Sequence, residues 1–362
     1  MPPTKLHGSS PQRRIEQEVE YFEKVDRVLE EDIMSNYDLL EVLGAGSYAK
    51  VVLGTLKPHA HPYFAERFPR RIAFKVMKRS PDADKATQDL EASRMISEIN
   101  YAKRFEASGL RLYFVSINPK AMTIAMEVAT GTLQTARTFQ SYPLEARMQH
   151  LMKIVDELAS LEAQGCMHSD VKPQNIMFNS EGVPVLGDFG FAKCLGEGPP
   201  RQGTPGFMAP EVWHGEYASD AWSSGLLMYL LVFEGREPSV TEIAEKQENF
   251  EGFMGVWLNI REDPLFRHVL KDMSESTYGG DFVEKMERTQ EQFWILNVVT
   301  LMAQMLEPNV ELRIDMRAVQ RLLEPLVKTM HNLGPDRLQA MLARSIREAD
   351  RLQLTRRCER LF

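Results

Sequence analysis

The sequence contains little cysteine. Its 362 residues include three, Cys166, Cys194 and Cys358, and no two of them form a Cys-x-x-Cys pair. An odd number of cysteines in a chain of this length argues against a disulfide framework, and the missing pair excludes a zinc knuckle. We therefore expect free and inert thiols, with a redox or covalent-ligand site at Cys166 or Cys194 as the alternative.

Long apolar runs and an excess of positive charge are also missing. The longest apolar stretch, residues 225–233, is far shorter than the ~20 residues of a membrane-spanning helix. Lys and Arg total 43 against 51 Asp and Glu, and a net charge of -8 argues against nucleic acid or an anionic membrane as the main partner. The first residues, MPPTKLHGSSPQRRIEQ, lack the apolar segment of a secretory signal. We expect a soluble protein with no transmembrane segment.

What remains is a globular composition, with 43% hydrophobic and 26% charged residues. The chain can hold two modest domains or one large bilobal domain. Residues 1–35 form an N-terminal extension, in which apolar residues recur every three or four positions over 15–33 and predict an amphipathic helix. We expect this helix to dock on the domain behind it, and a free partner-binding helix is the alternative.

From residue 36 the pattern changes to short β-like runs, and after Gly131 it becomes mostly helical. The expected strands are residues 37–43, 51–56, 71–77, 111–117 and 121–127, and the expected helices are 82–105, 148–164, 225–233 and 293–306. Residues 58–70, PHAHPYFAERFPR, read as a surface insertion with solvated histidines at 59 and 61. Residues 235–292 are charged and poorly periodic, and an arginine-rich helix is expected in 331–362.

A glycine-rich run lies between the first two expected strands. Residues 44–51 read GAGSYAKV, and side chains at Gly44 or Gly46 would obstruct a backbone that lies close over phosphate groups. Such a run is a weak signal by itself. Lys75 on the third strand adds a cation that could reach phosphates and pair with a helix carboxylate, for which Glu98 is the candidate and Glu91 the reserve.

A second group of polar residues follows in the helical half. Residues 168–175, HSDVKPQN, supply the carboxylate of Asp170, the cation of Lys172 and the amide of Asn175, and Asp188 follows in the run 188–190, DFG. Carboxylate and amide oxygens suit Mg²⁺ that bridges the phosphates of a nucleotide.

In this order, the motifs resemble a eukaryotic-type protein kinase domain over about residues 36–330. The resemblance extends to residues 203–211, GTPGFMAPE, to 220–225, DAWSSG, and to Arg313. It implies an α+β fold with two lobes, a small β-rich N-lobe (about 36–128) and a larger α-helical C-lobe (about 129–330), with an N-terminal helical extension.

The resemblance also implies a role for each matched residue, with ATP and Mg²⁺ as cofactors and protein substrates as partners. Asp170 would accept the proton of the substrate hydroxyl, with Lys172, Lys75 paired to Glu98, and Thr204 as the other catalytic residues. Asn175 and Asp188 would bind the metal. The nucleotide would lie against Gly44, Gly46, Val51, Ala73, Lys75, Glu127, Ala129 and Met177. Met126 would be the gatekeeper, and the pair Glu211–Arg313 and the residue Asp220 would be structural.

The sequence departs from the family at its usual activation switch. Ser169 stands where most regulated kinases carry an arginine that binds a phosphorylated activation-loop residue. Residues 191–203, FAKCLGEGPPRQG, contain no Ser, Thr or Tyr. We therefore expect activity without activation-loop phosphorylation, and Lys172 with Thr204 resembles the serine/threonine branch.

The N-terminal helix, the insertion and the catalytic loop without arginine more weakly resemble the secreted rhoptry kinases of coccidian parasites. This leaves two locations open, the cytoplasm or a host cell into which the protein is secreted as an effector. A nucleotide-binding pseudokinase that acts as a scaffold or allosteric partner is the alternative function, and a small-molecule phosphotransferase is a second. The N-terminal helix or residues 235–292 could supply a partner surface.

Overall fold

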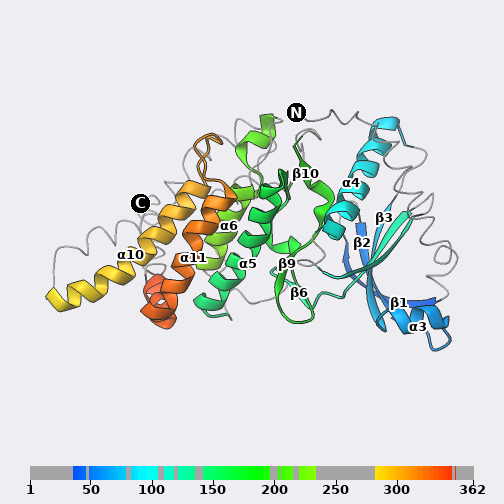
Figure 1. Cartoon of the computed structure of the whole chain (residues 1–362), viewed down its shortest axis with the longest axis horizontal. Helices are drawn as coiled ribbons and strands as arrows, with labels where there is room; N and C mark the ends of the chain where they lie inside the picture. Colours follow the sequence, from blue (N-terminus) through cyan, green and yellow to red (C-terminus); the bar gives the residue numbers. More distant parts are fainter. Residues whose placement is uncertain are drawn as a thin grey trace, which may run out of the picture. The chain divides into compact units, whose positions relative to one another are not determined.

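The computed structural model describes residues 36–45, 49–78, 83–104, 110–117, 121–134, 142–195, 203–204, 206–214, 220–233, 282–344 and 347. The predictions for the extension 1–35, for Gly46, for most of 235–292 and for the end of the arginine-rich helix lie outside these residues. The chain divides into two compact units, Met1–Thr130 with Met177–Phe191, and Gly131–Ile176 with Ala192–Phe362. We call them the first and the second unit; their elements are labelled in Figure 1.

The first unit is built on an antiparallel sheet whose strand order is β1-β2-β3-β5-β4. Its strands are β1 (Tyr37–Ala45), β2 (Ala49–Leu56), β3 (Arg71–Lys78), β4 (Leu112–Ile117) and β5 (Ala121–Met126). The helix α4 (Lys85–Arg104) follows β3, and the short strands β8 (Ile176–Phe178) and β9 (Pro184–Leu186) come later in the chain. The strands and the helix expected from the sequence in this region are present.

Alternation along β3 gives the two faces of the sheet different partners. Ile72 and Phe74 belong to one buried cluster, whereas Met77 belongs to another that includes Met95 and Ile99 of α4. Because successive side chains of a strand point to opposite faces, Lys75 shares the face of Met77. The sheet therefore directs Lys75 to the side on which α4 packs.

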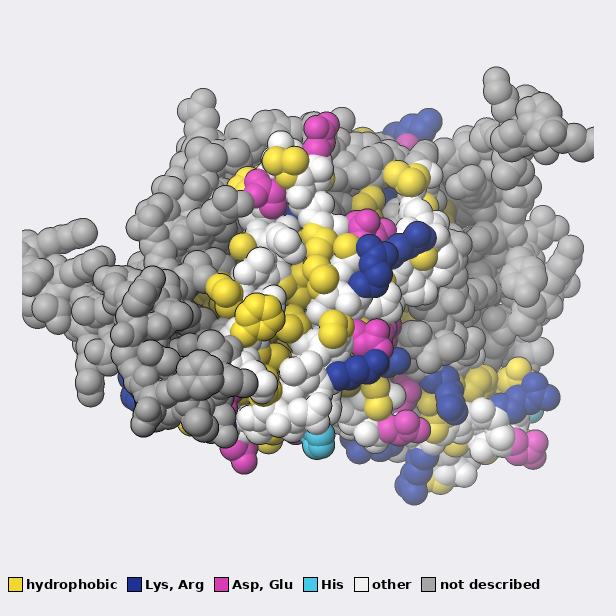
Figure 2. Space-filling view, turned by 60° about the vertical axis from the view of Figure 1, so that its left-hand side comes forward, with side chains coloured by type: hydrophobic (Ala, Val, Ile, Leu, Met, Phe, Trp, Pro, Cys, Tyr) yellow, Lys and Arg dark blue, Asp and Glu magenta, His cyan; other side chains and the backbone are white. Residues whose placement is uncertain are grey.

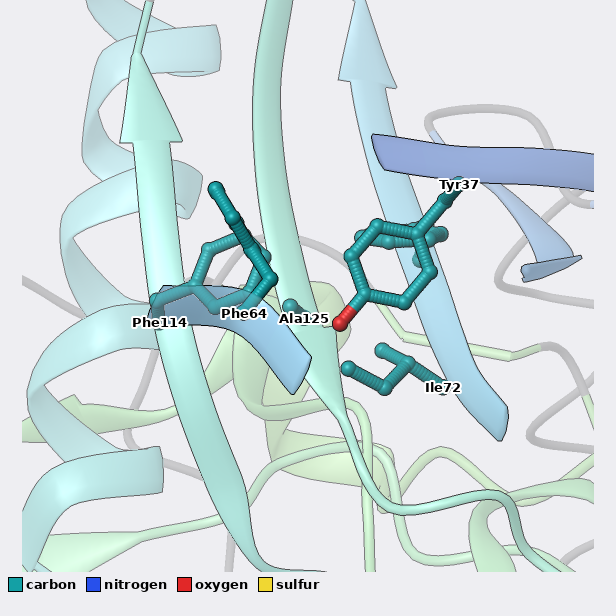
Figure 3. Close-up of a cluster of buried hydrophobic side chains, with 6 residues drawn as sticks. Tyr37, Phe64, Ile72, Phe114 and Ala125 are labelled. Atoms are coloured by element: carbon teal, nitrogen blue, oxygen red, sulfur yellow. The ribbon is translucent and has the colours of Figure 1, made fainter. Parts of the chain in front are cut away.

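The insertion between β2 and β3 is more structured than the sequence indicates. It contains the helix α3 (Pro62–Arg67), which starts where the His61 ring nitrogen Nδ1 accepts a hydrogen bond from the Tyr63 amide at 3.2 Å. Phe64 of α3 is only 2% exposed and packs with Tyr37 and Phe114, as Figure 3 shows. The prolines predict a loop, but an aromatic side chain between them is buried against the sheet and organises one helical turn.

The second unit is mainly helical. Its helices are α5 (Leu144–Ala163), α6 (Asp220–Val232), α10 (Phe282–Met305) and α11 (Met316–Leu333), and residues 335–344 are also helical. The helix expected from residue 293 thus begins earlier, at Phe282. Every residue of α6 is buried, and Gly225 allows this approach because a Cβ there would lie 2.9 Å from Leu306 Cγ.

Shorter elements complete the second unit. They are β6 (Gly131–Thr132), β7 (Cys166–Met167), β10 (Lys193–Cys194) and the 3-10 turns η1 (Pro173–Asn175) and η3 (Pro210–His214); the turn η2 (Phe189–Phe191) belongs to the first unit. A sheet-based first unit and a helical second unit confirm the expected α+β class.

The surface agrees with the charge balance of the sequence. On the face drawn in Figure 2, Lys and Arg side chains lie beside Asp and Glu among the described residues rather than in one continuous basic patch. In the part of the chain that the structure describes, no helix has the length and apolar character needed to cross a membrane.

A buried ion pair joins distant segments of the second unit. The two terminal nitrogens of the Arg313 guanidinium contact the Glu211 carboxylate, at 2.5 and 2.9 Å. The guanidinium also lies 4.9 Å from the centre of the Trp222 ring and donates to the Glu307 carbonyl. The arginine is therefore paired, hydrogen-bonded and stacked within the core.

We predict that Glu211→Ala lowers the free energy of unfolding by about 3–5 kcal/mol, because it leaves the Arg313 charge buried without its partner. The control is Glu324→Ala, which breaks the exposed Glu324–Lys328 pair on α11 and is expected to cost less than about 0.5 kcal/mol. Urea denaturation followed by tryptophan fluorescence measures both. Equal losses in the two variants would contradict the prediction.

Candidate active site

The first unit contains a cluster of three charged side chains around Lys75. The Lys75 ammonium lies 2.7 Å from Glu98 Oε1 and 2.8 Å from Asp188 Oδ1. Lys75 and Glu98 are buried, whereas the Asp188 side chain is 39% exposed. Of the two carboxylates considered from the sequence, Glu98 and not the reserve Glu91 is the one placed against this lysine.

The charge of Lys75 is maintained by its two partners. Burial alone would lower the pKa of the ammonium, but the negative charges of Asp188 and Glu98 outweigh burial and hold that pKa above its ordinary value. Lys75 therefore remains a cation throughout the physiological pH range.

Aromatic contacts with α4 hold the chain next to Asp188. The Phe189 ring stacks on Tyr101 at 6.0 Å with an interplanar angle of 7°, and the Arg94 guanidinium lies 5.0 Å from the centre of the Phe191 ring. Asp188 itself has a left-handed backbone, with φ 63°. A residue other than glycine keeps this conformation only where its surroundings fix it, and such positions concentrate at functional sites.

Arg94 and Tyr101 were not identified from the sequence as candidates for the site. They lie one turn on either side of Glu98 on α4, so the i, i+3 and i+4 spacing of a helix places all three along one side. This spacing was the available signal, but an arginine and a tyrosine on a charged helix are typical of a solvated face. Only their burial distinguishes them, with 5% and 4% of their surfaces exposed.

The second unit contains a cluster around the buried carboxylate of Asp170. Oδ2 accepts from the Lys172 ammonium at 2.7 Å and from the Asn175 amide at 2.9 Å. Oδ1 accepts from the Thr204 hydroxyl at 2.8 Å and from its backbone amide at 3.1 Å. Lys172 also donates to the Thr204 hydroxyl oxygen. Three residues predicted from the sequence thus meet at the carboxylate of a fourth, Asp170.

The Asp220 carboxylate holds the backbone that precedes Asp170. The amides of His168 and Ser169 donate to the two carboxylate oxygens of Asp220, at 2.7 and 2.9 Å. His168 is fully buried, and its Nδ1 accepts from the Asp170 amide at 3.3 Å, so it supports the loop rather than facing a substrate. Ser169 has a left-handed φ of 65°. Burial raises the pKa of Asp220 despite these bonds.

The residues predicted to contact the nucleotide base lie on several elements of the first unit. Val51 of β2 is opposite Lys75, and Ala73 of β3 is opposite Met126 at the end of β5. The Glu127 amide donates to the Arg111 carbonyl at 2.8 Å.

The other predicted base-contacting residues are placed as follows. Met177 lies on β8, close enough to Gly187 that a Cβ on that glycine would be 2.7 Å from its methyl group. Ala129 lies in the half-buried stretch after β5, and Gly44 is exposed near the end of β1.

The predicted metal ligands have the right chemistry for Mg²⁺. The amide nitrogen of Asn175 donates to the carbonyl and the carboxylate of Asp170, at 2.8 and 2.9 Å. Its amide oxygen is therefore the atom suited to a cation. Asp188 adds a half-exposed carboxylate in the first unit, and oxygen donors of this kind fit Mg²⁺ that also binds phosphate. Among the described residues, no three His, Cys, Asp or Glu side chains form a further metal-binding group, His59 and His61 included.

The expectation of free thiols at Cys166 and Cys194 was wrong. These cysteines form a disulfide between β7 and β10, where they face each other in the antiparallel register with their Cα atoms 3.9 Å apart. The count of cysteines made an extensive disulfide framework improbable, but a single cross-strand bond depends on which strands pair, and the sequence does not show this pairing.

We predict that Asp220→Ala lowers the free energy of unfolding by about 2–5 kcal/mol, because the buried amides of His168 and Ser169 lose their acceptor. Asp220→Asn keeps one acceptor oxygen and is expected to lose about half as much. Urea denaturation of both variants measures the difference. A fully stable Asp220→Ala protein would show that the two amides have another acceptor.

Comparisons with known proteins agree with this geometry. The family described as protein kinase domain matches residues 37–322. The chain is 29% identical over 218 residues to CBL-interacting protein kinase 4 of Oryza sativa subsp. japonica, covering 56% of this chain and 45% of that protein. It is 27% identical over 268 residues to calcium-dependent protein kinase 5 of Plasmodium falciparum (isolate 3D7), covering 67% and 44%.

A human relative shows a similar level of likeness. Calcium/calmodulin-dependent protein kinase type 1B of Homo sapiens is 28% identical over 216 residues, which cover 56% of this chain and 58% of that protein. The chain spans about half the length of the curated relatives it matches. With the family match over most of its length, and with the Lys75 and Asp170 clusters assembled within their units, the chain belongs to the protein kinase domain family.

Proposed function

We propose that the protein is an active serine/threonine protein kinase that transfers the γ-phosphate of ATP to hydroxyl groups of protein substrates. The observation that carries the proposal is the set of contacts around Asp170, where Lys172, Asn175 and Thr204 meet. Kinase catalysis depends mainly on positioning and on stabilising charge, and these residues supply both.

Each cluster has a distinct part in this reaction. Asp170 would orient the substrate hydroxyl and accept its proton, because its carboxylate is fixed by neighbours and remains an acceptor. Lys172 would neutralise charge on the transferring group. Lys75 would hold phosphate oxygens, kept in place by Glu98. Asn175 and Asp188 would hold Mg²⁺, which when bound neutralises the phosphate charges.

The Lys75–Asp188 contact places the proposed phosphate-binding cation beside one of the proposed metal ligands. The Lys75 ammonium lies 2.8 Å from Asp188 Oδ1. Asp188 is the more exposed partner, so a cation could approach its carboxylate while Lys75 retains Glu98.

The function we propose includes independence from activation-loop phosphorylation. Ser169 cannot make the charge-assisted contact that an arginine makes with a phosphate. Thr204 is the first hydroxyl-bearing residue after residue 190, and its hydroxyl is already engaged with Asp170 and Lys172. A phosphate on Thr204 would place negative charge against the Asp170 carboxylate, so it would inhibit rather than activate.

The domain boundaries and the partner surface expected from the sequence are part of the same proposal. A kinase domain over about 36–330 would be flanked by the extension 1–35 and by the arginine-rich segment 331–362. The extension or residues 235–292 would supply the surface for a protein partner.

We predict that Asp188→Asn and Lys75→Met each lower kcat by about 10²-fold or more, because charge on the transferring phosphoryl group loses its stabilisation. Lys328→Met is the control, since it makes the same change at an exposed lysine that pairs with Glu324. Phosphate transfer from labelled ATP with Mg²⁺ to a protein or peptide library measures activity, with Asp170→Asn as a second inactive variant.

Two results would decide against an active kinase. Equal activity of Asp188→Asn and the wild-type protein would contradict the assigned roles. Nucleotide binding with no transfer in the wild-type protein would favour the pseudokinase alternative. Thermal denaturation of each variant separates a lost function from a lost fold.

We predict that protein made in bacteria has the same kcat before and after treatment with a phosphatase, because no phosphate is needed to order the activation segment. The comparison is made at one fixed thiol–disulfide state, with mass spectrometry to verify that phosphate is absent. A drop of about tenfold or more, which is ~1.4 kcal/mol of transition-state stabilisation, would contradict the prediction.

A further inference from the structure

The disulfide Cys166–Cys194 lies at a distinctive place in the chain. Its partners are 28 residues apart, and the segment between them contains Asp170, Lys172, Asn175 and Asp188. The covalent ring therefore encloses the catalytic carboxylate, the catalytic lysine and both metal ligands of the proposed function. This segment also leaves the second unit after Ile176 and returns to it at Ala192.

The strand ladder that contains the disulfide is short. The strands β7 and β10 pair over only two residues each, with Lys193 opposite Met167 and Cys194 opposite Cys166. One further hydrogen bond follows, from the Leu195 amide to the Gly165 carbonyl at 2.9 Å. A two-residue ladder is marginal by itself, and the disulfide adds a covalent attachment to it.

The chain between Cys194 and Thr204 is thus attached at both of its ends to residues 166–172. At one end the disulfide joins Cys194 to Cys166, and at the other Thr204 bonds to Asp170 and Lys172. In regulated kinases a phosphate bound to an arginine makes such an attachment, and here Ser169 stands at the arginine position.

We propose that Cys166–Cys194 is a reversible redox modification site that fixes β10 to the catalytic segment and raises kinase activity when oxidised. This inference rests on the proposed kinase function for its effect on activity. Its redox partner is a small-molecule disulfide of the glutathione type. Cys194 is the half-buried partner and Cys166 the fully buried one, so exchange begins at Cys194.

The thiol–disulfide exchange with oxidised glutathione has two steps. The Cys194 thiolate attacks one sulfur of oxidised glutathione, forms a mixed disulfide and releases one glutathione thiolate. The Cys166 thiolate then attacks the Cys194 sulfur and releases the second glutathione thiolate. The two protons lost by the cysteines end on the two released thiolates. Two cysteine thiols are oxidised by two electrons, and one oxidised glutathione is reduced to two reduced molecules.

The test compares the wild-type protein with Cys194→Ser and Cys358→Ser, each equilibrated with excess oxidised or excess reduced glutathione. Peptide mapping by mass spectrometry detects the Cys166–Cys194 bond, thermal denaturation measures the constraint, and steady-state kinetics gives kcat and KM. Cys166→Ala is made as a second variant in case Cys194→Ser does not fold.

We expect the bond in oxidised wild-type protein and its loss in reduced glutathione. Reduction should lower kcat roughly tenfold with little change in KM for ATP, as expected for a positioning effect. It should lower the denaturation midpoint by about 5 °C, because a closed loop of this size constrains the unfolded chain. Cys194→Ser should match reduced wild-type protein in both conditions, and Cys358→Ser should respond like the wild type.

Three results would overturn the proposal. They are a missing Cys166–Cys194 bond after oxidation, a bond that reduced glutathione does not open, and equal kcat in the two states of an active enzyme. If the bond and the midpoint respond to glutathione but neither state transfers phosphate, the redox site stands and the proposed kinase function fails.

Discussion

Burial of charge is the constraint on which the described parts of this protein depend. Removing an ion from water costs several kcal/mol unless an opposite charge and hydrogen bonds replace the water. Lys75 meets this requirement with Glu98 and Asp188, and Asp170 meets it with Lys172 and the hydroxyl of Thr204. Each set includes partners from distant segments of the chain, Glu98 and Asp188 for Lys75 and Thr204 for Asp170, so full compensation requires these segments to fold together. The groups proposed for catalysis therefore also hold their units together.

The sequence was most informative where residue types and their order carry the chemistry. The α+β class followed from the order of the motifs and the five strands of the first unit from their β-like runs, and Glu98 was the candidate partner of Lys75 with Glu91 in reserve. It failed where a contact depends on tertiary packing. Nothing local shows that Phe64 in a proline-rich insertion is buried, or that Cys166 and Cys194 face each other across paired strands.

The segment of the second unit that carries Asp170 is held mainly through its backbone. Asp220 accepts from two successive amides, His168 accepts from a third, and the Cys166 bond lies immediately before them. These supports leave the functional end of the Asp170 side chain to interact with Lys172 and Thr204. A left-handed backbone at Ser169 is maintained by the same supports, since a serine does not favour that conformation by itself.

The sheet of the first unit has a hydrophobic layer on each face, and α3 contributes to one of them. Phe64 closes the cluster of Phe74 and Phe114 on one face, whereas Met77 and Ile99 pack on the other, which is the face of Lys75. A substitution in one of two layers that a sheet separates has little effect on the packing of the other layer. The reason is that a packing defect weakens mainly the contacts around the substituted side chain. A packing defect in the aromatic layer under α3 therefore weakens that layer first and leaves the Lys75–Glu98 contact on the other face in place.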